Sequence, residues 1–452
     1  MRRRTYLAVV GSAASTASGL AGCLGARGSE TADGTPTAAR ASTSPTDAPA
    51  RTTVPADEDT PVAYTYGRPT SNRVTAGAGA VHAVDPVDVD LGGVPQWLLA
   101  LPDSKWHGSG TLWVAVLGDG TVESVRTVGR DVEPGPSFRA LSRASPVALV
   151  GETGDSTGDT PRLLAPTGSE SPLSHPVLVD GTLVRVGGSG DLLVGDSRLD
   201  IEALPDSRVT VDPDSGRAVV LAGATDRYAH GALGDDIEAS RVVVVDVASA
   251  TVETTIDVSP AVVEGLAPIL ADLTGDGERA IVVTETDAES GARLVAYDMA
   301  GSLVARGPAI GSGFRWRHQL AVAPFAPDGE LELAVTKTPH IGGTVEFYRR
   351  RGDRLDIVAT RETYSSHALG SRNLDMARAG DFDGDGRLEL VVPTQDRRRL
   401  CGLHRIDDTP GVTAAWCRRV DGEIATNLAA PAAGTLELAV GRADGVLRIW
   451  PT

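Results

Sequence analysis

Aromatic residues are scarce in this sequence, and their scarcity limits the fold. Only 4% of the 452 residues are aromatic, with 5 Phe, whereas there are 52 Gly and 28 Pro. Because glycine and proline interrupt helices and favour turns, a bundle of long helices is excluded. Hydrophobic residues make up 41% of the chain, which is enough for a core. We therefore expect many short elements joined by turns.

Positive charge is also in short supply, and lysine is nearly absent. Lys and Arg total 42 against 60 Asp and Glu, which gives a formal net charge of −18. This balance excludes nucleic acid and anionic membrane surfaces as primary partners, because both require a cationic face. Lys105 and Lys337 are the only lysines. Such a composition resembles that of proteins from extremely halophilic archaea; an acidic secreted protein from a GC-rich genome is the alternative.

The N-terminus has the pattern of an export signal. Arginines at positions 2–4 precede a modestly apolar stretch at residues 6–20, which falls short of the roughly 18 to 20 apolar residues that span a bilayer. Residues 3–7 (RRTYL) resemble a twin-arginine signal, and residues 20–23 (LAGC) resemble a lipobox. The resemblance implies export and a lipid anchor on Cys23 at the outer face of the cell membrane. A cleaved signal with an incidental cysteine is the alternative.

The residues after Cys23 are predicted to form a disordered tether. From residue 26 to about residue 60 the chain is rich in Thr, Ala, Ser, Pro and Asp and contains no aromatic residue and no Ile. It cannot bury enough apolar area to offset the entropy lost on ordering. The expected organisation is a signal peptide at 1–22, a tether at 23–60 and a folded unit at 61–452, with the membrane contacted through the lipid only.

A repeat of about 50 residues runs through the folded unit. Each copy contains a short strand, a turn with glycine that is acidic in most copies, and an apolar strand, and a second strand pair follows. Four short strands per unit of this length are typical of a β-propeller. The sequence predicts an all-β propeller of seven four-stranded blades. The 106 residues between the first two turn glycines leave room for one degenerate copy. The turn glycines that mark the copies are Gly110, Gly216, Gly277, Gly329, Gly386 and Gly434.

The last unit reads as only three strands before the chain ends at Thr452. We expect its fourth strand to come from the N-terminal side, within residues 73–90. Such a closure would remove the open sheet edges between the first and last blades.

One turn, residues 381–389 (DFDGDGRLE), carries recognisable chemistry. Oxygen-bearing side chains stand at its positions 1, 3, 5 and 9, and glycine stands where a sharp turn is needed. This is the pattern of a calcium loop, similar in its first half to the EF-hand loop. A strand follows it, and no flanking helices are indicated.

In this context the turn resembles the FG-GAP/VCBS repeats of integrin-α-like propellers. The resemblance implies that the turn joins the first two strands of a blade and binds structural Ca²⁺. It implies a complete ligand set in the turn at 381–389 and a weaker site in the turn at 272–280, where Ala280 replaces the last acid. The alternative is that these turns bind no metal, because aspartate and glycine favour tight turns by themselves. The implied ligands are Asp381, Asp383, Asp385 and Glu389 with the carbonyl of Arg387, and, in the weaker site, Asp272, Thr274 and Asp276.

Cys401 and Cys417 lie in two candidate strands whose midpoint is residue 409. A hairpin that turns there would place them opposite each other, and outside the cell this favours a cross-strand disulfide. Two buried thiols are the alternative.

Cationic and amide side chains are expected to gather on the face opposite the acidic turns. That face is formed by loops between blades and between the second and third strands of a blade. The cluster predicts a site for a ligand that bears carboxylate or sulfate; the alternative is that these groups pair with acids and lock neighbouring blades together. The residues are Arg315, Arg317, His318, Lys337, His340, His367, Arg372 and Asn373.

Catalytic motifs are absent from the sequence: there is no G-x-S-x-G, no H-E-x-x-H and no phosphate-binding loop. We therefore expect a non-catalytic extracellular propeller that binds a protein or glycan ligand or serves as a scaffold. A propeller hydrolase or lyase acting on a surface glycan is the alternative, and it would need two acids, or an acid and a histidine, together on one face.

Overall fold

The structure is a computed structural model that describes residues 61–66, 72–103, 110–151, 161–408, 410–431 and 435–452. These residues form 33 β-strands and contain no helix. Within this part of the chain there is accordingly no helix of the length and apolarity that crossing a membrane requires. The predicted signal, Cys23 and the tether lie outside the described residues.

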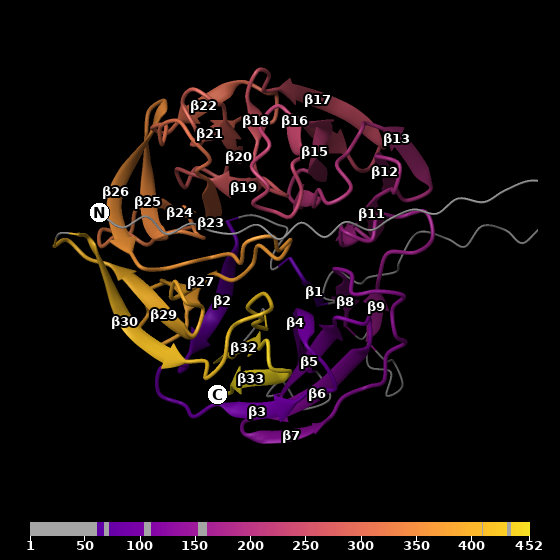
Figure 1. Cartoon of the computed structure of the whole chain (residues 1–452), viewed down its shortest axis with the longest axis vertical. Coiled ribbons are helices and arrows are strands. Elements are labelled where there is room, and N and C mark those ends of the chain that lie inside the picture. Colours follow the sequence, from indigo (N-terminus) through magenta and orange to yellow (C-terminus); the bar gives the residue numbers. More distant parts are fainter. Residues whose placement is uncertain (1–60, 67–71, 104–109, 152–160, 409, 432–434) are drawn as a thin grey trace, which may run out of the picture. The chain divides into compact units, whose positions relative to one another are not determined.

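The strands pair into small antiparallel sheets that follow one another around a common centre, which is the architecture of a β-propeller (Figure 1). The first three blades contain β4 (Pro95–Asp103), β5 (Gly110–Leu117), β6 (Val122–Val128) and β7 (Asp131–Pro134); β1 (Val62–Tyr64), β8 (Ala148–Val150) and β9 (Arg162–Leu164); and β10 (Val177–Val179), β11 (Thr182–Val186), β12 (Asp191–Val194) and β13 (Ser197–Asp200).

The next four blades share one pattern of four consecutive strands. They are formed by β14 (Thr210–Asp212), β15 (Arg217–Thr225), β16 (Glu238–Asp246) and β17 (Thr251–Asp257); β19 (Ile269–Asp272), β20 (Arg279–Thr286), β21 (Arg293–Tyr297) and β22 (Leu303–Arg306); β23 (Arg317–Ala323), β24 (Glu332–Lys337), β25 (Thr344–Arg351) and β26 (Arg354–Glu362); and β27 (Arg378–Asp381), β28 (Glu389–Pro393), β29 (Arg399–Arg405) and β30 (Val412–Arg419).

Eight blades are formed by the described residues, one more than the seven expected. The last consists of β32 (Leu438–Gly441), β33 (Val446–Trp450) and β3 (Val87–Asp90), and Ala429 adds an isolated bridge to Ala439 on its inner side. The stretch between Gly110 and Gly216, where we expected one degenerate unit, holds two sheets. Strands β8, β9 and β10 have 3 residues each, so their apolar pattern is too short to be counted from the sequence.

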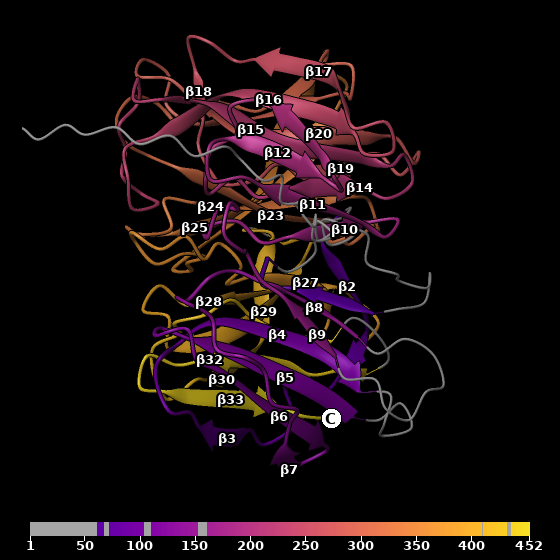
Figure 2. The same cartoon turned by 90° about the vertical axis from the view of Figure 1, so that its right-hand side faces the viewer.

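The N-terminal part of the described chain is distributed over several blades. Strand β1 pairs with β8, β2 (Val74–Gly79) lies parallel between β27 and β31 (Thr435–Leu436), and β3 completes the last blade by pairing with β33 (Figures 1 and 2). A Cβ at Gly79 would lie 2.5 Å from the carbonyl oxygen of Leu436, so only glycine fits at this close approach. The stretch 73–90 thus supplies the outer strand that the last unit lacks.

Apolar side chains between neighbouring sheets form the core. Ala271, Val282 and Leu294 of one blade pack against Val322 and Leu333 of the next. Each fully buried Val or Leu side chain among them contributes roughly 1.5 to 3 kcal/mol. A minor pairing, β18 (Val262–Val263), joins β16 to β20 and links two blades directly.

One further contact joins the first blade to the last, and a disulfide links two strands of the seventh blade. Leu98 and Trp113 of the first blade pack against Ala439 and Ile449 of the last. Within the seventh blade, Cys401 on β29 and Cys417 on β30 are register partners joined by a disulfide.

Candidate ligand-binding face and acidic turns

A pocket of about 480 Å³ opens among three connections: the one between β15 and β16, the one between β22 and β23, and the one between β24 and β25. Its volume lies within the usual range for small-molecule sites. It is lined by His230, Ile310, Phe314, Arg315, Trp316, Lys337, Thr338, Pro339, His340 and Ile341.

The backbone at the end of β24 brings two parts of this pocket together. Strands β23 and β24 pair antiparallel, with Arg317 opposite Lys337. The next residue, Thr338, adopts a left-handed conformation with φ of 46°, and its N–H donates to the carbonyl of Trp316 at 2.8 Å. The chain then turns sharply, and His340 joins Trp316 in the lining of the pocket.

Aromatic rings form the pocket wall. Phe314 stacks on the imidazole of His230 at 5.3 Å with an interplanar angle of 17°, and it meets Tyr228 edge-on at 5.1 Å. Despite these contacts Phe314 is 62% exposed, and Ile341 beside it is 84% exposed. Large apolar side chains exposed at the mouth of a pocket are typical of a contact surface.

Two histidines form a hydrogen-bonded relay behind this wall. His367 Nε2 donates to the carbonyl oxygen of Ser371, and His340 Nε2 lies 2.5 Å from His367 Nδ1. Burial is the main cause that lowers the pKa of His340 to about 4 and that of His367 to about 3. Both rings are therefore neutral at pH 7, so His367 Nδ1 accepts and His340 Nε2 donates. The Nδ1 atom of His340 is then left as an acceptor.

The charge of the pocket is opposite to that of the protein. None of the lining residues is Asp or Glu, although the chain carries a net charge of −18. Arg315 donates only to the carbonyl of Ile310, at 3.3 Å, and has no ion pair within the described residues. Lys337 lies 3.3 Å from Glu346 and keeps about a third of its side chain exposed. An anionic ligand would meet uncompensated positive charge here.

The eight residues that the sequence placed on this face fall into two groups, one at or directly behind the pocket and one away from it. Arg315, Lys337 and His340 line the pocket. Directly behind it, His367 contacts His340, and His318, 4% exposed, stacks under Trp316 at 4.8 Å.

The other three are engaged inside the fold, as the blade-locking alternative describes. Arg317 is 3% exposed and pairs with Glu346 at 2.9 Å. Arg372 pairs with Asp206 at 2.9 Å and also with Asp235. Asn373, equally buried, donates to the carbonyl of Gln96 at 3.1 Å. These side chains hold blades together and do not face the pocket.

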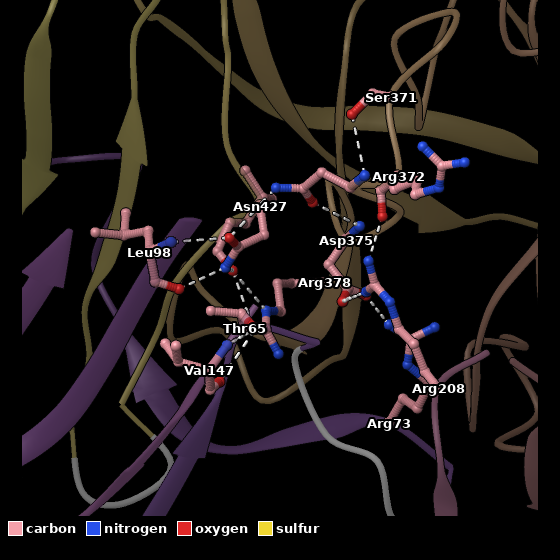
Figure 3. Close-up of polar contacts among 12 residues, drawn as sticks. Thr65, Arg73, Leu98, Val147, Arg208, Ser371, Arg372, Asp375, Arg378 and Asn427 are labelled. Atoms are coloured by element: carbon pink, nitrogen blue, oxygen red, sulfur yellow. Dashed lines mark hydrogen bonds and ion pairs between the residues drawn. The ribbon is translucent and has the colours of Figure 1, made fainter. Parts of the chain in front are cut away.

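A buried polar network that sequence reasoning missed lies between these blades (Figure 3). Arg73 and Arg208 both turn toward the carboxylate of Asp375, and Arg208 also donates to the carbonyl of Arg372. Asn427 bridges to the first blade by donating to the carbonyl of Leu98 at 2.7 Å. Hundreds of residues separate these partners in sequence, and no local motif marks them.

Arg208 is enclosed by aromatic rings as well as by the carboxylate. Its guanidinium lies 5.0 Å from the ring of Tyr66 and 5.3 Å from that of Trp97, and the residue is fully buried. Such cation–π contacts compensate part of the cost of burying the charge. We interpret the network as a structural element that joins the N-terminal segment to the blades.

An acid and a histidine also meet near the pocket. His230 Nδ1 lies 2.5 Å from a carboxylate oxygen of Glu264, whose other oxygen accepts from Thr286. Burial, followed by the charge of Glu264, raises the pKa of neighbouring Glu238 to about 9. Glu238 is 4% exposed and Glu264 is 2% exposed. Glycoside hydrolysis needs two carboxyl groups that flank the scissile bond, and carboxyl groups buried to this extent do not reach a ligand in the pocket.

The acidic turn 381–389 connects β27 to β28, the first two strands of the seventh blade. Asp381 accepts from the N–H groups of Gly384 at 2.7 Å and Gly386 at 3.1 Å, so its carboxylate organises the turn. The side chain of Arg387 reaches away to the carbonyl of Arg405 at 2.6 Å.

Three acids and a histidine converge beside this turn. Ligand atoms of Asp383, Asp385, Glu389 and His404 all lie within 4.8 Å of one another. Glu389 is fully buried, and burial raises its pKa. His404, on β29, contacts Glu389 at 3.2 Å, and this hydrogen bond raises the pKa of the imidazole. The three carboxylates suit a hard cation such as Ca²⁺, whereas the imidazole is a partner that the sequence did not indicate.

The corresponding turn in the fifth blade, residues 272–280, has the same backbone hydrogen bonds but, among the described residues, no comparable cluster of acids and histidine. Asp272 accepts from Gly275 at 2.6 Å and Gly277 at 2.9 Å, as Asp381 does in its own turn. Next to it, Arg279 forms ion pairs with Asp212, at 3.0 Å, and with Asp214. Asp276 caps Glu278, and the N–H of Thr274 donates to Asp272. No group of three converging Asp, Glu, His or Cys side chains forms here among the described residues.

No protein-family model and no curated protein matches this chain. Solved structures match at low identity: BamB from Moraxella catarrhalis is 15% identical, over 82% of this chain and 100% of that one, with a TM-score of 0.46.

Two further matches are of the same kind. Hydrazine synthase from Kuenenia stuttgartiensis is 14% identical, over 81% of this chain and 97% of that one, with a TM-score of 0.43. The structure of U3-55K is 11% identical, over 83% and 100%, with a TM-score of 0.41. The propeller assignment rests on the strand pairing of this chain itself, and this fold is compatible with binding or scaffolding.

Proposed function

We propose that this protein is a non-catalytic binding propeller whose loop-face pocket takes an anionic ligand at the cell surface. One observation carries the proposal: a pocket with an aromatic wall, exposed Phe314 and an arginine without an ion pair, lined by no acid, in a strongly acidic chain. The pocket stands on rigid, closely packed blades, which is the arrangement in which loops present binding groups.

Binding is favoured over hydrolysis by the position of the acids. Glu264 contacts His230 of the pocket lining, but it is buried and held by His230 and Thr286, and Glu238 is also buried. A glycan in the pocket would meet cations and rings and no free carboxylate.

The proposal is tested with a panel of ligands against the full chain. Carboxylated and sulfated oligosaccharides and their neutral counterparts are compared by calorimetry. Arg315→Ala should weaken binding of the anionic members about tenfold, which corresponds to 1.4 kcal/mol. Arg143, exposed and remote from the pocket lining, provides the matched control Arg143→Ala. Binding that is equal for neutral and anionic ligands would contradict the proposal.

Export and anchoring belong to the same proposal. The N-terminal signal pattern and Cys23 support an exported lipoprotein, and the arginine-rich acidic composition supports a haloarchaeal origin. In cells, Cys23→Ser should release the protein to the medium, whereas the wild type should stay with washed membranes. Retention of the variant on membranes would count against the anchor.

We further propose that the turn at 381–389 binds a structural Ca²⁺, as the resemblance to FG-GAP/VCBS repeats implies. Asp381, Asp383, Asp385 and Glu389 would hold the ion through carboxylates and Arg387 through its carbonyl. Asp381 would also shape the turn, and His404 would orient Glu389. A bound cation would neutralise a carboxylate cluster that is partly buried.

A further inference from the structure

The imidazole of His340 gives the pocket a hydrogen-bond acceptor, because its contact with His367 determines which ring nitrogen carries the proton. The carbonyl of Ser371 can only accept, so His367 must donate to it through Nε2. Neutral His367 then accepts at Nδ1 from His340 Nε2, and His340 Nδ1 carries a lone pair. Among the described residues this atom has no hydrogen-bond partner, and His340 lines the pocket. A ligand atom placed there must be a donor.

This acceptor narrows the set of ligands that the positive charge alone would admit. Carboxylate and sulfate groups are both ionised at neutral pH and carry no proton, so neither can donate to His340. A hydroxyl group donates readily. A ligand that uses both Arg315 and His340 therefore combines an anionic group with hydroxyl groups.

The arginine and the ring specify the rest of the ligand. A guanidinium binds a carboxylate through two parallel hydrogen bonds, and Arg315 is available because it forms no ion pair among the described residues. The exposed ring of Phe314, backed by His230, offers a flat apolar surface. A sugar ring packs one apolar face on such a surface while its hydroxyls point outward.

We propose that the ligand is a hexuronate unit of an acidic glycan, with its ring over Phe314, its carboxylate on Arg315 and one hydroxyl donated to His340 Nδ1. The assignment rests on the proposed function, since it names the ligand of the same pocket. His367 is a positioning residue that sets the tautomer of His340 without touching the sugar.

The test compares four probes by calorimetry at pH 7 with the full chain: trigalacturonate, its methyl ester, maltotriose and dextran sulfate. Trigalacturonate should bind best, because only it presents both carboxylate and hydroxyl groups. The methyl ester should bind about tenfold more weakly, and maltotriose more weakly still.

Variants separate the individual contacts. His340→Phe keeps a ring and removes the acceptor, so it should weaken trigalacturonate about tenfold and leave the binding of inorganic sulfate, which has no hydroxyl group, unchanged. His340→Gln restores an acceptor and should recover part of the affinity. Phe314→Ala should weaken every ring-bearing carboxylate, whereas Leu303→Ala, which removes a side chain of similar exposure from β22, should have no effect.

Acidification provides an independent check. The pKa values of His340 and His367, about 4 and about 3, lie well below neutrality. In a His230→Phe variant, which removes the third imidazole of the pocket lining, affinity for trigalacturonate should accordingly stay constant from about pH 6 to pH 8, because neither ring gains a proton there. A rise in affinity of this variant on going from pH 8 to pH 6 would mean that a protonated histidine binds the carboxylate, which would overturn the assignment.

The outcomes distinguish this inference from the proposal on which it rests. If dextran sulfate binds and depends on Arg315 but His340→Phe changes nothing for trigalacturonate, the hexuronate assignment is wrong and the anion site stands. If no anionic probe binds, both fail. Should His340→Phe lower the melting temperature, the comparison of trigalacturonate with its methyl ester on the wild type decides alone.

Discussion

At the scale of single residues, the buried arginines make contacts that lysine could not make. Arg317 donates to Glu346 and to two carbonyl oxygens, Ala292 at 2.8 Å and Pro308 at 2.7 Å, and so joins two blades with one side chain. A guanidinium can serve three acceptors in fixed directions, whereas an ammonium group is a single point charge. Arg405 makes a comparable bridge to Glu332 at 2.8 Å.

Removing this bridge should cost stability rather than ligand affinity. Arg317→Ala leaves Glu346 buried with only Lys337 and Tyr348 as polar partners, and breaking a buried pair typically costs about 3 to 5 kcal/mol. Chemical denaturation measures the loss in the free energy of unfolding. Arg143→Ala serves as the control and should change stability by less than about 0.5 kcal/mol. Unchanged stability with weakened ligand binding would instead place Arg317 in the site.

The carboxyl of Glu238 should make the stability of the protein depend on pH. Its pKa is raised from 4.5 to about 9, mainly by burial. Between these values the folded chain retains a proton that the unfolded chain releases, so the free energy of unfolding falls as the pH rises. The slope can reach about 1.4 kcal/mol per pH unit.

Glu238→Gln removes this titration and should flatten the profile. The variant should be more stable than the wild type at pH 8 and differ less at pH 5, as measured by denaturation across this range. Glu133→Gln, a change at an exposed position on β7, is the control and should leave the slope intact. Parallel profiles for wild type and Glu238→Gln would show that the raised pKa is wrong.

At the scale of elements, the turns at 381–389 and 272–280 share the same backbone hydrogen bonds but differ in the side chains that gather beside them. Asp381 and Asp272 cap their turns through the same pair of glycine amides. Only the first turn adds the cluster of Asp383, Asp385, Glu389 and His404. The backbone hydrogen bonds that shape the turn are therefore separable from the cluster that we propose to bind calcium.

This separation makes the calcium proposal testable within one chain. Calcium at a hundred times its dissociation constant should stabilise the wild type by about 2.7 kcal/mol, and EDTA should remove the effect. Asp383→Ala should abolish the dependence on calcium. Asp272→Ala, which removes the equivalent cap in the fifth blade, should lower the melting temperature but keep that dependence. A wild type that melts identically with and without EDTA at modest salt would refute the site.

At the scale of the whole molecule, the N-terminal segment closes the ring of blades. Strand β3 covers the edge of β33, and Asp88 on β3 is held by Arg448 at 2.7 Å and by Arg442 at 3.3 Å. An uncovered sheet edge invites association with another chain. Strands β1, β2 and β3 therefore belong to the fold, although they precede the repeats.

Two truncations test this role. Deletion of residues 1–60 should leave a cooperative monomer, because it removes no described strand. Deletion of residues 1–90 should expose the edge of β33 and give oligomers or loss of cooperative melting, as measured by light scattering and circular dichroism. A cooperative monomer after the second deletion would show that β3 is dispensable.

The sequence by itself determined the class of fold and the place of the acidic turn, because both depend on short patterns: strand alternation, glycine spacing and clustered aspartates. The eighth blade escaped detection, since strands of 3 residues carry too little pattern. Only the tertiary structure decided which cations face a pocket. Arg315 and Arg317 are two residues apart, yet one lines the pocket and the other is buried against Glu346. Likewise His230, Phe314 and His340 come from different connections, and only the packing of whole blades brings them together.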